Sequence, residues 1–148
     1  MKLQTLCDLE LRYTSLESID FGAGGQIYGT MEGMVSGERL IGRIRLTNLA
    51  ARRPDNVNLP ALRGVLDSDD GAKLYVEMNG IATLRSSDNA RVFATWVSFR
   101  TSDSRYAWLN TSFAVLEGVL DQVGVGGVAR GRIYLGEVTL LGTAASPA

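Results

Sequence analysis

Apolar and polar residues alternate with a period of two along most of this chain, which is typical of β-strands that turn one face toward a core. The repeat is clearest over Leu3–Tyr13, where Cys7, Leu9 and Leu11 stand in phase. Further strands are predicted over Gln26–Val35, Arg39–Asn48, Ala61–Asp67, Ala72–Met78, Arg91–Thr101, Arg105–Glu117 and Val128–Leu141. No segment keeps the 3.6-residue period of an amphipathic helix, so we expect an all-β protein.

The best-defined hairpin lies within Leu66–Gly80. Its Asp69-Asp70-Gly71 segment is a turn signal, because glycine takes positive φ angles freely and aspartate hydrogen-bonds to its own backbone. We therefore interpret the two aspartates as turn residues rather than as a catalytic carboxylate pair. The strand after the turn is predicted to bury Ala72, Leu74, Val76 and Met78 on one face.

Glycines within the second predicted strand indicate strong curvature. Gly29 and Gly33 fall on one face, and glycine weakens a strand unless the sheet bends or another group comes close. An open sheet of this many strands would expose two edges, which closure removes. We predict one domain over residues 1–141, a closed or nearly closed antiparallel barrel of about eight to nine strands, with a flexible tail at 142–148.

One irregular segment interrupts the strands, at Asn48–Leu59. Pro54 and Pro60 exclude a central strand there, so we expect a loop that caps an opening of the barrel. Its Arg52 and Arg53 are either solvated, as most charge runs are, or contact an anion at a pocket mouth.

Composition narrows the functional classes. The chain has 148 residues, 45% of them hydrophobic, which is enough to bury one core without disulfide bonds or a structural metal ion. A net charge of −1 gives no electrostatic footprint for nucleic acid, and no apolar run approaches the length of a membrane span. The N-terminus lacks the apolar region of a signal peptide, so a cytoplasmic location is the default. Cys7 is the only cysteine, and we expect it to be a buried apolar side chain.

The absence of histidine removes every nucleophile–histidine arrangement, histidine-based metal ligation and the commonest general base. We predict no cofactor and no metal. Lysine occurs only at Lys2 and Lys73, which leaves one serious Schiff-base candidate beside a turn. Any chemistry must then use carboxylates, tyrosines, arginines and amide dipoles, or a borrowed cofactor.

Candidate site residues follow from the polar and aromatic side chains that alternate along the strands. If this face points inward, Glu32, Tyr28 and Arg43 are the catalytic candidates. The ligand-binding candidates are Arg45, Trp96, Ser98, Arg100, Tyr106, Trp108 and Asn110. Alternation shows which residues share a face and leaves open which face is inside.

Each candidate has a plain structural alternative. A buried Glu32 would have a raised pKa suited to acid–base work, whereas in the alternative it pairs with Arg43 or Arg45 or faces water. Trp96 and Trp108 either form pocket walls or simply fill the barrel. Asn110 either donates to a substrate carbonyl or satisfies the backbone of a loop.

Two segments resemble a known family. DSDDGAKLYVEMNG (67–80) resembles the "DDG–apolar–strand–G" signature of the small all-β family called domain of unknown function 3237, and FRTSDSRYAWLN (99–110) resembles its "RT–acidic–x–x–YAWLN" signature. The likeness covers about Leu6 to Val138. It departs at Gln26–Tyr28, where the family usually has an arginine, and at Arg52–Asn56, where it usually has a Gly-Ala-Asp-Trp-like segment. The resemblance implies an often dimeric barrel similar to allene oxide cyclase-like and lipocalin-like proteins, with both departing segments near the pocket.

Three functions remain open at this point. The first is an isomerase, lyase or cyclase that performs acid–base chemistry on a hydrophobic carbonyl or aromatic metabolite. The second is a non-catalytic carrier or sensor of a small ligand, with Trp96 and Trp108 as its binding slot. The third is a structural or interaction barrel with a filled interior, which a cavity below about 100 Å³ would select, since ligand pockets are several times larger. The oligomeric state stays open, with a homodimer the commonest outcome for such barrels.

Overall fold

The computed structural model describes residues 1–140, in which the chain is almost entirely β-structure. The strands are β1 (Lys2–Asp20), β2 (Gly25–Ser36), β3 (Ile41–Asn48), β4 (Ala51–Arg52), β5 (Asn58–Leu59), β6 (Ala61–Ser68), β7 (Lys73–Leu84), β8 (Arg91–Arg100), β9 (Phe113–Leu120) and β10 (Val128–Glu137). One 3₁₀ helix, η1 (Ala107–Thr111), lies between β8 and β9. The predicted tail at 142–148 lies outside the described residues.

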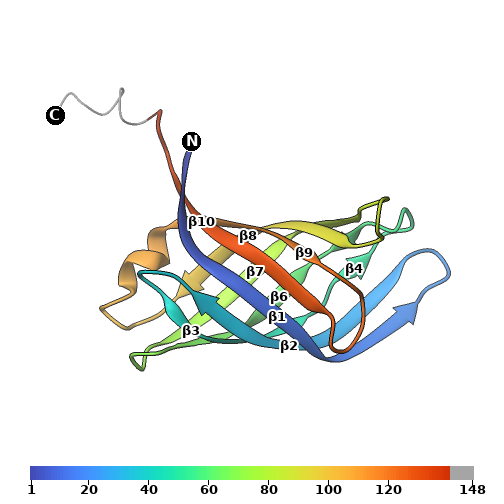
Figure 1. Cartoon of the computed structure of the whole chain (residues 1–148), viewed down its shortest axis with the longest axis horizontal. Helices are drawn as coiled ribbons and strands as arrows, with labels where there is room; N and C mark the ends of the chain where they lie inside the picture. Colours follow the sequence, from blue (N-terminus) through green and yellow to red (C-terminus); the bar gives the residue numbers. More distant parts are fainter. Residues whose placement is uncertain (141–148) are drawn as a thin grey trace.

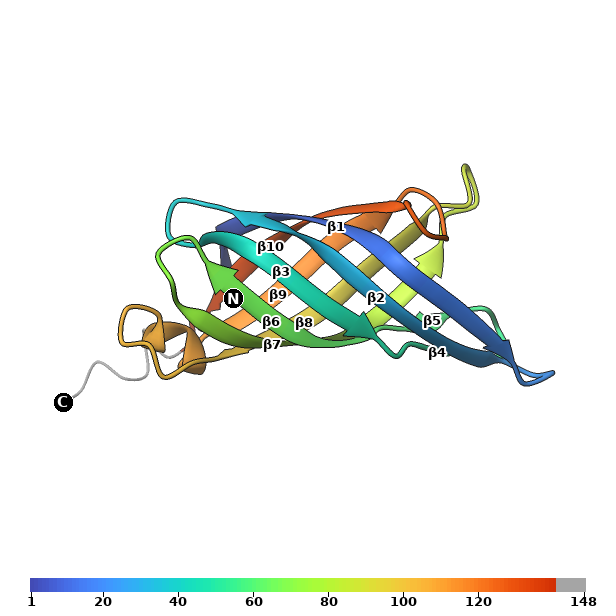
Figure 2. The same ribbon diagram turned by 90° about the horizontal axis from the view of Figure 1, so that it is seen from below.

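Eight of the strands close into an antiparallel barrel, as the sequence predicts. The strands follow one another around the wall in the order β1-β2-β3-β6-β7-β8-β9-β10, and β10 pairs with β1 to close the ring (Figure 1). β4 and β5 fall within the predicted loop and form a narrow bridge from β2 to β7 at one end of the barrel (Figure 2). No helix of the described residues is long and apolar enough to cross a membrane.

The core fills the barrel because each strand turns its apolar residues inward. The predicted face of β7 is buried, with Leu74, Val76 and Met78 having no exposed surface. Cys7 is buried in the same core, as predicted. Gly33 allows β1 and β2 to approach closely, because a Cβ at this position would lie 1.8 Å from the backbone oxygen of Glu10.

Several predicted strand boundaries are wrong. β7 continues to Leu84, six residues past Met78, and β10 ends at Glu137. β1 continues to Asp20, seven residues past Tyr13, and its hairpin with β2 extends beyond the neighbouring strands (Figure 2). The predicted strand Arg105–Glu117 instead begins as η1, and β9 starts only at Phe113. The chain leaves the wall here because the Asn110 side chain accepts from the Thr101 N–H and donates to the Thr101 carbonyl oxygen, both at 2.9 Å.

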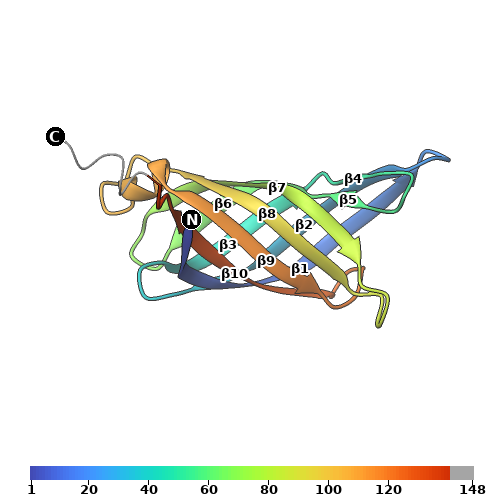
Figure 3. The ribbon, with the colours of Figure 1, turned by 90° about the horizontal axis from the view of Figure 1, so that it is seen from above.

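The two ends of the barrel are built differently (Figure 3). At the first, which we call the η1 end, lie η1, the turn between β2 and β3 and the Asp69-Asp70-Gly71 turn, where Gly71 has φ +91°. At the second, the β4–β5 end, lie the short strands β4 and β5 and the connections that lead from β1 to β2, from β7 to β8 and from β9 to β10.

Candidate functional site

The polar face that carries the candidate residues lies on the outside of the barrel. Glu32, Arg43 and Arg100 are exposed, Tyr28 is 50% exposed and Trp96 is 44% exposed. Arg45 is exposed as well, and Ser98 is half-buried. The sequence left the inward face open, and the condition under which these residues would line a site is not met, because an eight-stranded barrel gains more from burying the opposite, aliphatic face. Whether any of these residues acts on a ligand stays a prediction.

Three of the predicted residues do come together on the outer wall. Glu32 and Arg45 are cross-strand partners, and Arg43 lies on the same strand as Arg45. They line an open groove over Gly33 together with Glu10, Arg12, Met34, Ile44 and Asp67. Arg45 pairs with Asp67 at 3.4 Å, whereas Glu32 faces water without an ion pair in the described part of the chain. Exposed pairs of this kind are weak, because water screens them.

Tyr106 stabilises the η1 end instead of contacting a ligand cavity. The side chain is buried, and its hydroxyl donates to the Asp70 carboxylate at 2.7 Å. The Ser68 hydroxyl donates to the same carboxylate at 2.5 Å. These two hydrogen bonds, that from Ser68 first, lower the pKa of Asp70. The prediction that Asp70 has a turn role is confirmed.

Trp108 and Asn110 also have structural partners at this end. The indole Nε1 of Trp108 donates to the Arg105 carbonyl oxygen at 3.1 Å, and the Arg39 guanidinium lies 4.1 Å from the centre of its ring. Asn110 ties η1 to the end of β8, which is the alternative that the sequence left open for it. Trp96 lies on the outer wall of β8, so it does not form an interior slot with Trp108.

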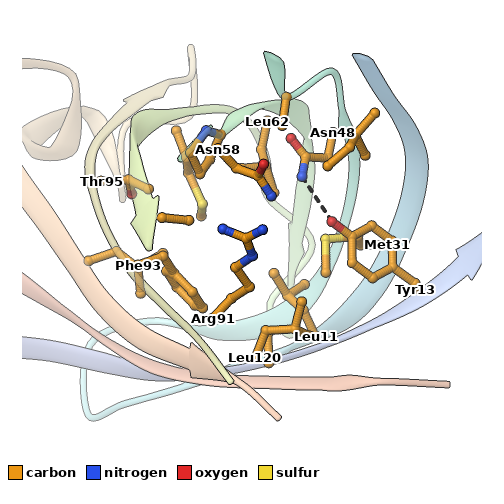
Figure 4. Close-up of a pocket in the computed structure, with 17 residues that line it drawn as sticks. Leu11, Tyr13, Met31, Asn48, Asn58, Leu62, Arg91, Phe93, Thr95 and Leu120 are labelled. Carbon is orange, nitrogen blue, oxygen red and sulfur yellow. Dashed lines mark hydrogen bonds between the residues drawn. The ribbon is translucent and has the colours of Figure 1, made fainter. Parts of the chain in front are cut away.

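A cavity of about 70 Å³ lies inside the barrel toward the β4–β5 end. Most of its wall is aliphatic, including Leu11, Met31, Leu62, Met78, Leu116 and Leu120. Five side chains in the lining carry polar atoms, namely Tyr13, Asn48, Asn58, Arg91 and Thr95 (Figure 4). Ile27, from the first segment that departs from the family pattern, lines the cavity. The second segment, Arg52–Asn56, contributes no lining side chain, and its Asn56 carbonyl oxygen contacts a lining residue by accepting from Arg91.

Arg91 is the only charged residue among the described residues that line this cavity. It is the first residue of β8 and is 7% exposed, and its guanidinium lies in the middle of the cavity (Figure 4). Nη1 donates to the Asn56 carbonyl oxygen at 2.7 Å, while Nε is buried without a partner. No carboxylate of the described chain pairs with Arg91. Burial, and secondly the positive charge of Arg52, lower the pKa of Arg91.

Tyr13 and Asn48 form a second polar group on the opposite wall. The Ala61 N–H donates to Oδ1 of Asn48 at 3.3 Å, so the amide presents Nδ2 to Tyr13, and Nδ2 donates to the Tyr13 hydroxyl oxygen at 2.9 Å. The hydroxyl hydrogen of Tyr13 has no acceptor among the described residues and is available to the cavity. Burial raises the pKa of Tyr13, and the Asn48 hydrogen bond opposes this effect more weakly.

Glycines make room for the two rings of the cavity wall. A Cβ at Gly29 would lie 2.8 Å from the Tyr13 ring, and a Cβ at Gly118 would lie 2.4 Å from the ring of Phe93. Gly118 is the cross-strand partner of Phe93 on β9. Each ring thus packs over a glycine, which keeps it against the wall and preserves the space at the centre.

The loop at Asn48–Leu59 reaches the cavity at both of its ends, through Asn48 and Ala50 at the first and Asn58 at the second. Asn58 lines the cavity and accepts a hydrogen bond at 3.3 Å from Nε of Arg52, which is half-buried. Arg53 is exposed and pairs with Asp55. The predicted loop thus contains two short strands and lines the cavity, and its role as a cap stays a prediction. In the described residues, no three His, Cys, Asp or Glu side chains are placed to hold a metal ion.

The sequence contains a signal for Arg91 that the prediction did not use. Arg91, Phe93, Thr95, Val97 and Phe99 share one face of β8, so a charged side chain stands in phase with a core face. An arginine at such a position must either reach water or have a function inside.

The comparisons with known proteins agree with this fold. The model of the family described as protein of unknown function (DUF3237) matches residues 1–129. The chain belongs to this family. The family resemblance of the two motifs is thus confirmed. No curated protein shows significant similarity to the chain.

Solved structures share the family barrel at low sequence identity. The chain is similar to a β-barrel-like protein from Acinetobacter baumannii, with TM-score 0.77, 20% identity and coverage of 90% of this chain and 94% of that one. It is also similar to a conserved protein of unknown function from Rhodopseudomonas palustris, with TM-score 0.77, 19% identity and coverage of 90% and 96%. A third similar structure is described as an enzyme from Penicillium herquei, with TM-score 0.66, 20% identity and coverage of 89% and 93%.

Proposed function

We propose that this barrel binds a small organic anion at its β4–β5 end, with Arg91 as the partner of the anionic group. The observation that carries the proposal is the buried Arg91 guanidinium, which faces a cavity without any carboxylate to balance it. A buried charge is costly unless it is paired and hydrogen-bonded. An incoming carboxylate, enolate or phenolate supplies the missing charge through a charge-assisted hydrogen bond.

The rest of the cavity wall favours a ligand that is apolar beyond its anionic group. Its wall is mainly aliphatic, with the Phe93 ring on one side and the Tyr13 ring on another. A cavity of about 70 Å³ holds several waters or one small organic molecule, because one water needs about 10–15 Å³ measured in the same way. The ligand class is thus a short apolar carboxylate or a similar monoanion.

Binding is tested with acetate, butanoate and benzoate as probes, and with butanamide as the uncharged match of butanoate. We expect the carboxylates, and not the amide, to raise the melting temperature, because a ligand at 100 times its Kd stabilises the folded state by about 2.7 kcal/mol. Arg91→Met should abolish the shift. Arg130→Met, which changes an exposed arginine on β10, is the matched control and should keep it. Equal shifts in both variants would overturn the role of Arg91.

Acid–base catalysis of the isomerase, lyase or cyclase type is the second candidate, and the Tyr13 hydroxyl favours it. A phenol that stays protonated and has a free hydrogen is suited to donate to a developing oxyanion on the ligand. The description of the Penicillium herquei structure as an enzyme gives this candidate further support. Tyr13→Phe would then reduce turnover and leave carboxylate binding within about twofold. An alternative that uses Glu32 and Arg43 places the reaction in the outer groove, and unchanged rates in Glu32→Gln and Arg43→Ala would end it.

A filled structural barrel is the third candidate, and the size of the cavity favours it. The interior volume of about 70 Å³ meets the sequence-based criterion of less than about 100 Å³ for a filled barrel, and ligand pockets are typically several times larger. If none of the three carboxylates shifts the melting temperature or perturbs the amide resonances of residues around the cavity, this candidate is selected and the binding proposal is wrong.

A further inference from the structure

Thr95, like Arg91, has a buried polar atom without a partner in the described structure. It is 5% exposed, it lines the cavity, and its hydroxyl oxygen makes no hydrogen bond in the described structure. A buried hydroxyl without a partner loses its hydrogen bonds to water and gains nothing in return. Val97, two residues further along the same face, shows that an apolar side chain of nearly the same shape fits this wall.

Thr95 lies deeper in the barrel than Arg91. Arg91 is paired with Leu84 and Leu120 at the ends of the neighbouring strands, whereas Thr95 is paired with Gly80 and Leu116 toward their middle. The Cα atoms of Arg91 and Thr95 are roughly 13 Å apart, from about 3.3 Å per residue of an extended strand. Phe93 lies between the two residues on the same face of β8, and all three side chains line the cavity.

We infer that the ligand carries a second oxygen, placed to bond the Thr95 hydroxyl while its anionic group contacts Arg91. This inference rests on the proposed binding function and makes its ligand class specific. A short apolar segment would lie against Phe93, with the carboxylate toward Arg91 and a carbonyl or hydroxyl oxygen toward Thr95. The ligand class is a short oxo- or hydroxycarboxylate rather than a plain fatty acid.

The test compares 4-oxopentanoate with 4-methylpentanoate by titration calorimetry. These two anions have the same number of non-hydrogen atoms and differ in the group that would face Thr95. For the wild-type chain we expect the oxo acid to bind about tenfold more tightly, the effect of one neutral hydrogen bond. Thr95→Val should bring the ratio of dissociation constants close to one, and Thr95→Ser should keep most of the preference.

The outcomes separate this inference from the binding proposal. If the wild-type chain binds both acids in an Arg91-dependent way but with equal affinity, the second contact is wrong and the anion site stands. If it binds neither acid, the binding proposal fails and this inference fails with it. A melting temperature for Thr95→Val at or above that of the wild type shows that the variant is folded, because removal of an unpartnered hydroxyl is expected to stabilise it.

Discussion

The two ends of the barrel use polar side chains in opposite ways. At the η1 end, polar groups are paired with one another: Tyr106 and Ser68 both donate to Asp70, and Arg105 forms an ion pair with Asp103 at 2.8 Å. The β4–β5 end also has surface pairs such as Arg85–Asp88, but inside it Nε of Arg91 and the hydroxyl of Thr95 are buried without partners in the described structure. Buried polar groups in proteins are nearly always hydrogen-bonded, so unpartnered ones need an explanation.

This contrast separates the family motifs from the candidate site. The "DDG" turn and the "YAWLN" segment are the most recognisable parts of the chain, and their side chains stabilise the η1 end. The unpaired groups at the other end stand in segments without a striking motif. The residues of the two family motifs thus stabilise the η1 end, whereas the unpaired groups of Arg91 and Thr95 at the other end are available to a ligand.

The largest effect that we expect from a single substitution is at Tyr106. Tyr106→Ala removes a buried ring and one of the two hydroxyl donors to the Asp70 carboxylate, and we expect a loss of about 3–5 kcal/mol in the free energy of unfolding. Urea denaturation measures this. Tyr75→Ala, at a position that is 42% exposed on the outer wall, is the control and should cost much less. A loss below about 1 kcal/mol for Tyr106→Ala would show that the η1 end does not depend on this network.

Substitution of Arg91 is expected to raise the free energy of unfolding, whereas substitution of Tyr106 lowers it. Arg91→Met loses the hydrogen bond to the Asn56 carbonyl oxygen but also removes an unpaired buried charge, and the removal of the charge has the greater effect on stability. We expect the free energy of unfolding in urea, without any ligand, to rise by about 1 kcal/mol. Arg91→Lys keeps the charge and should not stabilise the protein. If Arg91→Met destabilises the protein by more than about 1 kcal/mol, Arg91 has a structural role, and the two ends do not differ as argued.

Alternation along the strands predicted the barrel because it is a local property of the sequence. The in-phase set Leu74, Val76 and Met78 identifies a strand and its face without any knowledge of its neighbours. Closure follows from the number of strands and the short turns. Alternation does not show which face of a strand points into the barrel. Glu32 and Arg43 were chosen as candidates on the assumption that the polar face contacts a ligand, whereas it faces water.

The candidate site was harder to predict because its residues are far apart in the chain. Tyr13, Asn48 and Arg91 come from β1, β3 and β8, and only the register of the closed barrel brings them to one end. η1 was missed for a related reason. The bonds from Asn110 to Thr101 that fold this segment back span nine residues, and a strand-like pattern of side chains continues through it.

The smallest effect concerns the stability of the η1 end in acid. The Arg105 side chain is the first cause that lowers the pKa of Asp103 to about 2, from about 3.9 in an unfolded chain. A carboxyl whose pKa is lower in the folded state stabilises it above pH 4, and this contribution is lost as the pH falls toward 2. At the opposite end of the barrel, the pKa of Asp88 in the β7–β8 connection is also lowered to about 2, first by its hydrogen bond with Arg85, so this group adds to the decline in the wild type and in Asp103→Asn alike. The free energy of unfolding should therefore decline between pH 4 and 2, and Asp103→Asn should make this decline shallower.

Urea midpoints at pH 7, 4, 3 and 2 measure the slope, with Asp20→Asn on the β1–β2 turn as the control. Because these groups are exposed, the effect should shrink further in 0.5 M salt, and a slope in Asp103→Asn identical to that of the wild type would remove Asp103 from the contacts that stabilise this end.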